Sequence, residues 1–165
     1  MNMNMNRIIK AAAILYMLFP FQAALAEWQL KDEMTDEITT IAISDEVTST
    51  RPMDFPYTRT VSALGFACDT KGKEFAYIIF STLNLVRDGS FLRLRFDDEE
   101  VIKMSAFRNS DVLHFRRDAK AIRRFMRHTT VKLELNWFSQ GRVYFEYSLE
   151  GASDAIKRAR EICQQ

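Results

Sequence analysis

Few residues in this 165-residue chain have the type and spacing that chemistry requires. The two histidines are His114, which lies between Leu113 and Phe115, and His128, which follows a basic stretch. Neither has a metal-binding partner at a useful spacing, so we expect no zinc site. A glycine-rich phosphate loop and the Gly-x-Ser-x-Gly and His-Glu-x-x-His motifs are absent from the sequence. A Ser-His-Asp triad assembles from distant positions, so the sequence leaves it open, but the prediction is a non-enzymatic protein without a cofactor.

The two cysteines, Cys68 and Cys163, form the clearest chemical pair. An even number of cysteines in an oxidising compartment favours a disulfide. A loop of about 100 residues would be closed, which the chain-entropy model values at roughly 4–5 kcal/mol. Two free buried thiols or a redox pair are the alternatives, although the Cys-x-x-Cys spacing of a redox pair is absent. We predict a structural disulfide that holds a C-terminal helix.

An acidic run, Asp97 to Glu100, offers carboxylates that could bind calcium. It lacks the spaced Asp-x-Asp-x-Asp-Gly pattern that directs several oxygens to one ion. We therefore predict a solvated hairpin tip and no metal site.

A basic run offers a surface for an acidic partner, a phosphate or an anionic lipid head group. The alternative is a solvated helix face opposite a core stripe. Insertion of this helix into a membrane is disfavoured because its apolar face is narrow. The predicted basic surface consists of Arg93, Arg95, Arg116, Arg117, Lys120, Arg123, Arg124 and Arg127.

The N-terminus has the pattern of a bacterial-type export signal. Arg7 and Lys10 precede an apolar stretch over residues 11–21, and an Ala-x-Ala sequence ends at Ala26, just before Glu27. This order predicts a signal peptide that is cleaved between Ala26 and Glu27. The apolar stretch is shorter than the roughly 20 residues that span a bilayer. An uncleaved anchor and a buried core helix are the alternatives.

Cleavage would leave residues 27–165 as a single disulfide-closed, β-rich domain in the periplasm or the medium. The whole chain has a net charge of +1, and residues 1–26 carry two basic and no acidic side chains. The remainder is then close to neutral at −1, so we expect no nucleic-acid partner. No second long apolar run follows, so we expect no stable membrane insertion after cleavage.

Alternating apolar and polar residues predict antiparallel strands over much of the chain. A loop is expected over residues 45–59, where Pro52 and Pro56 break regular structure. The predicted strands are residues 37–44, 60–68, 75–80, 91–97, 101–107, 111–115, 130–138 and 142–149.

Two segments have helical spacing instead. Residues 117–128 place Ala121, Ile122, Phe125 and Met126 on one face. Residues 152–163 form a predicted C-terminal helix with Ser153 as its cap and Ile156, Ala159, Ile162 and Cys163 toward the core. The predicted fold class is α+β, mainly antiparallel β, with a sandwich-like or curved sheet and two helices, the last one C-terminal.

Several short motifs occur in a recognisable order. They are Trp28, Met34-Thr-Asp36, Leu64-x-x-x-Cys68, Tyr77-Ile78, Leu92-Arg-Leu-Arg-Phe-Asp-Asp98, a Phe-Arg-x-x-x-x-x-Ile helix, a Leu-x-Leu strand, Phe-x-x-x-Leu-x-Gly151 and Cys163. This order resembles the VasI-type accessory proteins associated with type VI secretion, and similar exported proteins of phages and bacterial envelopes. The resemblance implies a non-enzymatic envelope protein with a β-rich domain, and it brings no catalytic residues.

Two functions remain open. The first is an accessory or interaction protein of the bacterial envelope, which binds an envelope protein through the basic surface or a sheet edge. The second is a periplasmic inhibitor or exclusion-type binder, which blocks a cell-wall hydrolase or a phage component with the loop at residues 45–59. The sequence leaves the identity of the partner and the oligomeric state open.

Overall fold

The computed structural model describes residues 28–32, 38–82, 91–109 and 112–164. The expected signal peptide and its cleavage site at Ala26 and Glu27 lie outside the described residues. Within the described ranges, no helix is long and apolar enough to cross a membrane.

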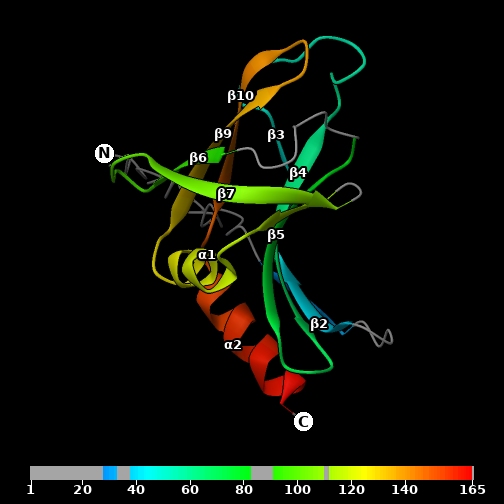
Figure 1. Ribbon diagram of the computed structural model, residues 1–165, viewed down its shortest axis with the longest axis vertical. Helices are drawn as coiled ribbons and strands as arrows, with labels where there is room; N and C mark the ends of the chain where they lie inside the picture. Colours follow the sequence, from blue (N-terminus) through cyan, green and yellow to red (C-terminus); the bar gives the residue numbers. More distant parts are fainter. Residues whose placement is uncertain (1–27, 33–37, 83–90, 110–111, 165) are drawn as a thin grey trace, which may run out of the picture.

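The described chain is mainly antiparallel β-sheet with two helices, as the sequence predicts (Figure 1). The alternating segments form strands at nearly the predicted bounds. In chain order the elements are β1 (Gln29–Asp32), β2 (Ile38–Ile43), β3 (Val47–Thr48), β4 (Val61–Asp69), β5 (Glu74–Phe80), β6 (Phe91–Phe96), β7 (Ile102–Asn109), β8 (Val112–Phe115), α1 (Asp118–Phe125), β9 (Thr130–Trp137), β10 (Gly141–Ser148) and α2 (Ala152–Cys163).

All strands belong to one curved sheet. Its order is β1-β2-β4-β5-β8-β7-β6-β9-β10, and β3 pairs with β4 outside this path. The first half of β7 pairs with β6 and its second half with β8, so the sheet turns at this strand. The chain after β3 reaches β10, where Ser49 pairs with Phe145 and the Thr50 N–H donates to the Tyr144 carbonyl at 2.9 Å. The sheet therefore closes on itself through β3, and the curved form of the predicted sheet is the one observed.

One face of every long strand points into the closed sheet. The alternation predicted for the β9–β10 hairpin is confirmed, because the cross-strand pairs Leu133–Phe145 and Val131–Tyr147 are buried on the same face. The largest fully buried side chains are aromatic, and their rings meet edge to face, as Phe80 and Trp137 do at a centroid distance of 5.4 Å. Burial of this apolar face supplies most of the folding free energy.

The helices cover the interior at one end of the sheet (Figure 1). The predicted face of α1 is confirmed, since Ala121, Ile122 and Phe125 are buried, with Met126 packed at their edge. Helix α1 ends at Phe125, earlier than the predicted residue 128, because the following residues turn back into β9.

Helix α2 has the predicted bounds but not the predicted cap. The residue before the helix is Gly151, whose φ of 79° lies in the left-handed region that glycine tolerates best. The prediction that Ser153 caps α2 is wrong, because the chain must reverse sharply after Leu149 and the helix has already begun at Ala152.

Two short strands were not predicted from the alternation of apolar and polar residues. Residues Gln29–Asp32 form β1, a polar edge strand that pairs with β2 and shows no alternation of apolar side chains. The predicted loop at residues 45–59 contains β3, which is only two residues long. Both strands depend on backbone pairing more than on side chains, so periodicity does not detect them.

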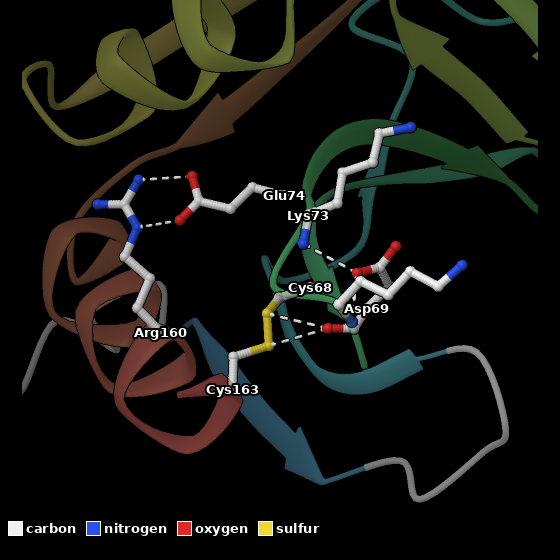
Figure 2. The surroundings of a disulfide bond; sticks show 7 residues. Cys68, Asp69, Lys73, Glu74, Arg160 and Cys163 are labelled. Carbon is white, nitrogen blue, oxygen red and sulfur yellow. Dashed lines mark hydrogen bonds and ion pairs between the residues drawn. A yellow bond between two sulfur atoms is a disulfide. The ribbon is translucent and has the colours of Figure 1, made fainter. Parts of the chain in front are cut away.

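The predicted disulfide joins β4 to the end of α2 (Figure 2). The Cα atoms of Cys68 and Cys163 are 6.4 Å apart, and both sulfurs lie beside the Asp69 carbonyl oxygen. One helical turn earlier, Arg160 forms a two-point ion pair with Glu74, whose longer contact is 2.8 Å. These hydrogen bonds with Glu74 raise the pKa of Arg160. A covalent and an ionic link therefore fix the same end of α2 to the sheet.

Reduction of the disulfide should lower the melting temperature. The bridge spans 95 residues, and a loop of that size corresponds to roughly 4–5 kcal/mol, or on the order of 10 °C for a domain of this size. Thermal unfolding with and without reductant measures the effect. The same reductant should leave the melting of the Cys68→Ser/Cys163→Ser variant unchanged, and an unchanged melt of the oxidised protein after verified reduction would refute the stabilising role.

Candidate partner-binding surface

Helix α1 is held in place at its first turn. The carboxylate of Asp118 accepts a hydrogen bond from the Ala76 backbone N–H at 2.8 Å, which ties the helix to β5. An acid in the first turn and the bases Arg123 and Arg124 in the last turn both complement the helix dipole. Asp118 therefore both starts α1 and fixes it against the sheet.

Most of the predicted basic surface lies on α1 or directly beside its two ends. Two of its members are engaged: Arg124 forms an ion pair with Glu99, and the guanidinium of Arg116 lies 5.4 Å from the Phe107 ring centroid. Four others have no ion pair among the described residues. We call these four the α1 basic face: Arg117, Lys120, Arg123 and Arg127.

The α1 basic face follows from helical spacing. Lys120 and Arg123 lie three residues apart within α1, opposite the buried stripe, while Arg117 directly precedes the helix and Arg127 follows its end. Arg117, Arg123 and Arg127 are exposed, and Lys120 is half-buried. Lys120 and Arg123 line two adjacent surface hollows, one of which also contains Arg127 and His128.

The remaining two predicted bases lie elsewhere. Arg93 and Arg95 project from β6 into a hollow lined by β9 and β10 residues. Arg93 pairs with Glu134 at 2.9 Å, and Arg95 lies opposite Lys132 in the neighbouring strand. The structure places these two members of the predicted basic surface in a different hollow from the helical bases, because strand pairing sets their outward direction on β6.

Asp97 joins three elements at the end of α1. It follows β6, and its Oδ1 accepts hydrogen bonds from the backbone N–H and the hydroxyl of both Thr129 and Thr130, at 2.8–3.2 Å. Its Oδ2 lies 3.0 Å from His128 Nδ1. The acidic run is therefore not simply a solvated tip, since its first residue fixes the turn from α1 into β9.

These contacts favour the charged form of Asp97. Burial acts to raise the pKa of its carboxyl, but the hydrogen bonds from Thr129, Thr130 and His128 outweigh it and hold that pKa well below its usual range. The residue also has φ of 45°, a left-handed conformation that Asp and Asn tolerate better than most side chains.

Neither histidine is part of a Ser-His-Asp arrangement among the described residues. His128 pairs with Asp97, but its Nε2 points toward Arg124 and Glu99, at 3.5 and 3.9 Å. His114 stacks on the Phe107 ring at a centroid distance of 5.3 Å. No group of three or more histidines, cysteines or acids within the described ranges is placed to hold a metal.

The loop at residues 45–59, which the sequence offers as an inhibitory loop, lies at the end of the sheet away from the two helices (Figure 1). Asp54 donates its backbone N–H to Gln140 Oε1 at 2.8 Å, and Arg51 donates to the Gln140 carbonyl. Tyr57 is buried against Trp137, with ring centroids 5.5 Å apart. We call residues 49–60 and the adjoining turn at 138–141 the loop end.

Two aromatic rings remain uncovered at the loop end. Phe55 is 88% exposed and Phe138 is 62% exposed, although the loop around Phe55 is held by the contacts of Gln140. Exposed rings on a fixed backbone lose little entropy on binding and are typical anchors of protein interfaces.

The sequence did not reveal the structural role of Asp97 or the exposure of Phe55. The sequence shows only that Asp97 is an acid at the end of a strand. Its hydrogen-bond donors, Thr129 and Thr130, lie more than 30 residues later, so no local pattern links them to it. The signal for Phe55 is a large apolar residue directly before Pro56 in a polar loop, where no core position is available.

The comparisons with known proteins identify no relative. No family model matches the chain, and no curated protein or solved structure is significantly similar to it. The resemblance to VasI-type proteins therefore remains a prediction from the motifs.

Removal of the Asp97 charge should destabilise the fold and alter its acid response. The native pKa lies below the unfolded value of about 3.9, so the stabilisation is complete above that pH and is lost as the pH falls below it. Asp97→Asn keeps a side chain that tolerates the backbone conformation, and it should cost about 1–2 kcal/mol at pH 7. Urea unfolding at pH 7 and pH 3 measures both effects.

Asp98→Asn is the matched control, because Asp98 is exposed and carries the same charge. It should change stability by less than about 0.5 kcal/mol. Equal losses in the two variants would contradict the assignment of Asp97.

Proposed function

We propose that this chain is a non-catalytic binding protein of the bacterial envelope that docks on an acidic surface of a protein partner. The observation that carries the proposal is the α1 basic face, whose four cations have no ion pair among the described residues. Some other cations of the protein are paired, for example Arg160 with Glu74 and Arg93 with Glu134. Unpaired cations aligned on one helix face provide long-range attraction and orientation toward an acidic partner.

The envelope compartment is supported by two features. The motif at residues 1–26 is typical of an export signal. The disulfide between Cys68 and Cys163 is of a kind that persists in oxidising compartments. The resemblance to VasI-type proteins favours an accessory role in type VI secretion, with a component of that machinery as the partner.

A second candidate function is inhibition of a cell-wall hydrolase or a phage component. The loop end favours it, since Phe55 projects from a backbone that Gln140 and the Tyr57–Trp137 contact hold in place. A preformed loop with an exposed ring is suited to enter a cleft in an enzyme.

Charge reversal on the α1 basic face should abolish partner capture. Lys120→Glu/Arg123→Glu/Arg127→Glu removes attraction and adds repulsion, which should weaken binding by at least about tenfold at low salt. The measurement is quantitative cross-linking of the tagged protein to envelope fractions, with captured proteins identified by mass spectrometry.

The control variant is Arg59→Glu/Lys103→Glu/Arg158→Glu, which makes the same change in net charge at three exposed positions off the helix face. It should retain the partner, and rising salt should release the partner from the wild type. The proposal fails if no envelope protein is enriched, or if both triple variants capture it equally.

Inhibition by the loop end should depend on Phe55. If the second candidate is correct, the wild type should inhibit a lysozyme-type enzyme in a turbidity assay, and Phe55→Ala should weaken inhibition by at least about tenfold, or about 1.4 kcal/mol. Phe91→Ala is the control, because Phe91 is also exposed, at 66%, but lies on β6. Absence of inhibition by the wild type across muramidases, amidases and phage lysins would remove this function.

A further inference from the structure

The outer face of β6, β9 and β10 carries rows of side chains that lie opposite one another across the strands. One row places Arg93 opposite Glu134, and Glu134 opposite Tyr144. The next row places Arg95 opposite Lys132. The two rows border a hollow of about 150 Å³. We call it the β6–β9 hollow, and it is lined by Arg93, Arg95, Val101, Lys132, Glu134 and Tyr144.

Two of the three cations that line the β6–β9 hollow are paired. Arg93 Nη1 lies 2.9 Å from Glu134 Oε1. Lys132 Nζ lies 2.8 Å from Glu146 Oε2. Arg95 has no ion pair among the described residues, and the side chain opposite it is a second cation, Lys132. The hollow therefore has one more positive charge than these two carboxylates neutralise, and the excess lies at Arg95.

Sheet stability does not account for Arg95. Like charges directly opposite one another destabilise an antiparallel pair of strands, whereas opposite charges stabilise it. Arg93, two residues earlier on the same strand, lies opposite a carboxylate and fits this rule. Arg95 is exposed and faces a cation, so its guanidinium is free to bind a ligand.

The β6–β9 hollow also has apolar walls. Val101, which precedes β7 and is 46% exposed, and Tyr144 on β10 border it from opposite sides, with β6 and β9 between them. The aliphatic stems of arginine and lysine side chains add further apolar surface. A ligand that fits the hollow therefore has an apolar group as well as a charge.

Size and charge narrow the class of ligand. Sites for drug-sized ligands are usually about 300–1,000 Å³, so a hollow of about 150 Å³ holds a single small group. One positive charge in excess matches a monoanion better than a phosphate, whose charge is about −1.5 to −2 at neutral pH. The planar guanidinium of Arg95 can donate two parallel hydrogen bonds to a carboxylate.

We propose that the β6–β9 hollow binds a small monocarboxylate that carries an apolar group. The carboxylate lies on the Arg95 guanidinium beside Lys132, and the apolar group lies between Val101 and Tyr144. Glu134 accepts a hydrogen bond from an N–H group next to the carboxylate. An N-acylated amino acid and the C-terminal residue of a peptide share this chemistry.

Titration of the ¹⁵N-labelled protein with N-acetylvaline tests the site. The backbone amide resonances of Arg95, Lys132 and Tyr144 should shift and saturate, with a dissociation constant in the millimolar range because the site is small and open to solvent. N-acetylvaline amide has the same apolar group without the charge, and it should bind at least about tenfold more weakly. Absence of saturable shifts, equal binding of the acid and its amide, or tighter binding of inorganic phosphate overturns the proposal.

Single substitutions separate the two parts of the site. Arg95→Gln removes the excess charge at an exposed position and should weaken N-acetylvaline at least about tenfold. Val101→Ser should weaken N-acetylvaline severalfold but leave acetate binding unchanged, since acetate lacks the larger apolar group.

Arg142→Gln is the matched control for Arg95→Gln. Arg142 is on the same face of the sheet, but its side chain is 69% exposed, lies 3.7 Å from Glu134 and does not line the hollow. The control should keep the dissociation constant within about twofold, because solvent screens an exposed charge outside the site. Equal losses in the two variants would show general attraction to a basic surface and overturn the site.

Ligand length distinguishes the two sources of the carboxylate. N-acetyl-Ala-Ala-Val should bind more tightly than N-acetylvaline if the natural ligand is a peptide end, and equally if it is a free acid. The Lys120→Glu/Arg123→Glu/Arg127→Glu variant should bind N-acetylvaline as the wild type does, so this site and the α1 basic face can fail separately. Loss of N-acetylvaline binding in a folded triple variant would place the acid on α1 and overturn the proposal.

Discussion

Closure of the sheet through β3 is the constraint on which the remaining structure depends. Two backbone contacts, from Ser49 to Phe145 and from Thr50 to Tyr144, connect β10 to the strand that pairs with β4. Once the sheet is closed, every long strand has an inner and an outer side. The inner side must be apolar to form the core, while the outer side is free to carry function. Helices α1 and α2 then close the end of the interior, and α1 is left with one side in solvent (Figure 1).

The parts of the fold that follow from side-chain periodicity could be predicted from the sequence. Strands β6, β9 and β10 alternate cleanly because each has one buried face, and α2 repeats with helical spacing because Ile156 and Ala159 must face the sheet. The disulfide was also predictable, since the two cysteines are the only ones in the chain. Strands β1 and β3 were not, because backbone hydrogen bonds place them and their side chains leave no periodic pattern.

The candidate site was predictable only in part, for a similar reason. Helical spacing alone aligns Lys120, Arg123 and Arg127, so the sequence reveals them as neighbours. Whether a cation is free or paired depends on contacts across the sheet, as for Arg93 with Glu134 and Arg124 with Glu99. The position of Asp97 depends on two threonines in another strand, which no local pattern encodes.

The two candidate surfaces lie at different ends of the closed sheet, so one can be occupied without blocking the other. The loop end lies beyond Trp137, and the α1 basic face lies before Thr130, so the seven steps along β9 separate them by about 24 Å. A partner held by the cations of α1 would leave Phe55 accessible at the loop end. Charge attraction at one end and an aromatic contact at the other could then act together on one large partner, and linked sites bind more tightly than one site alone.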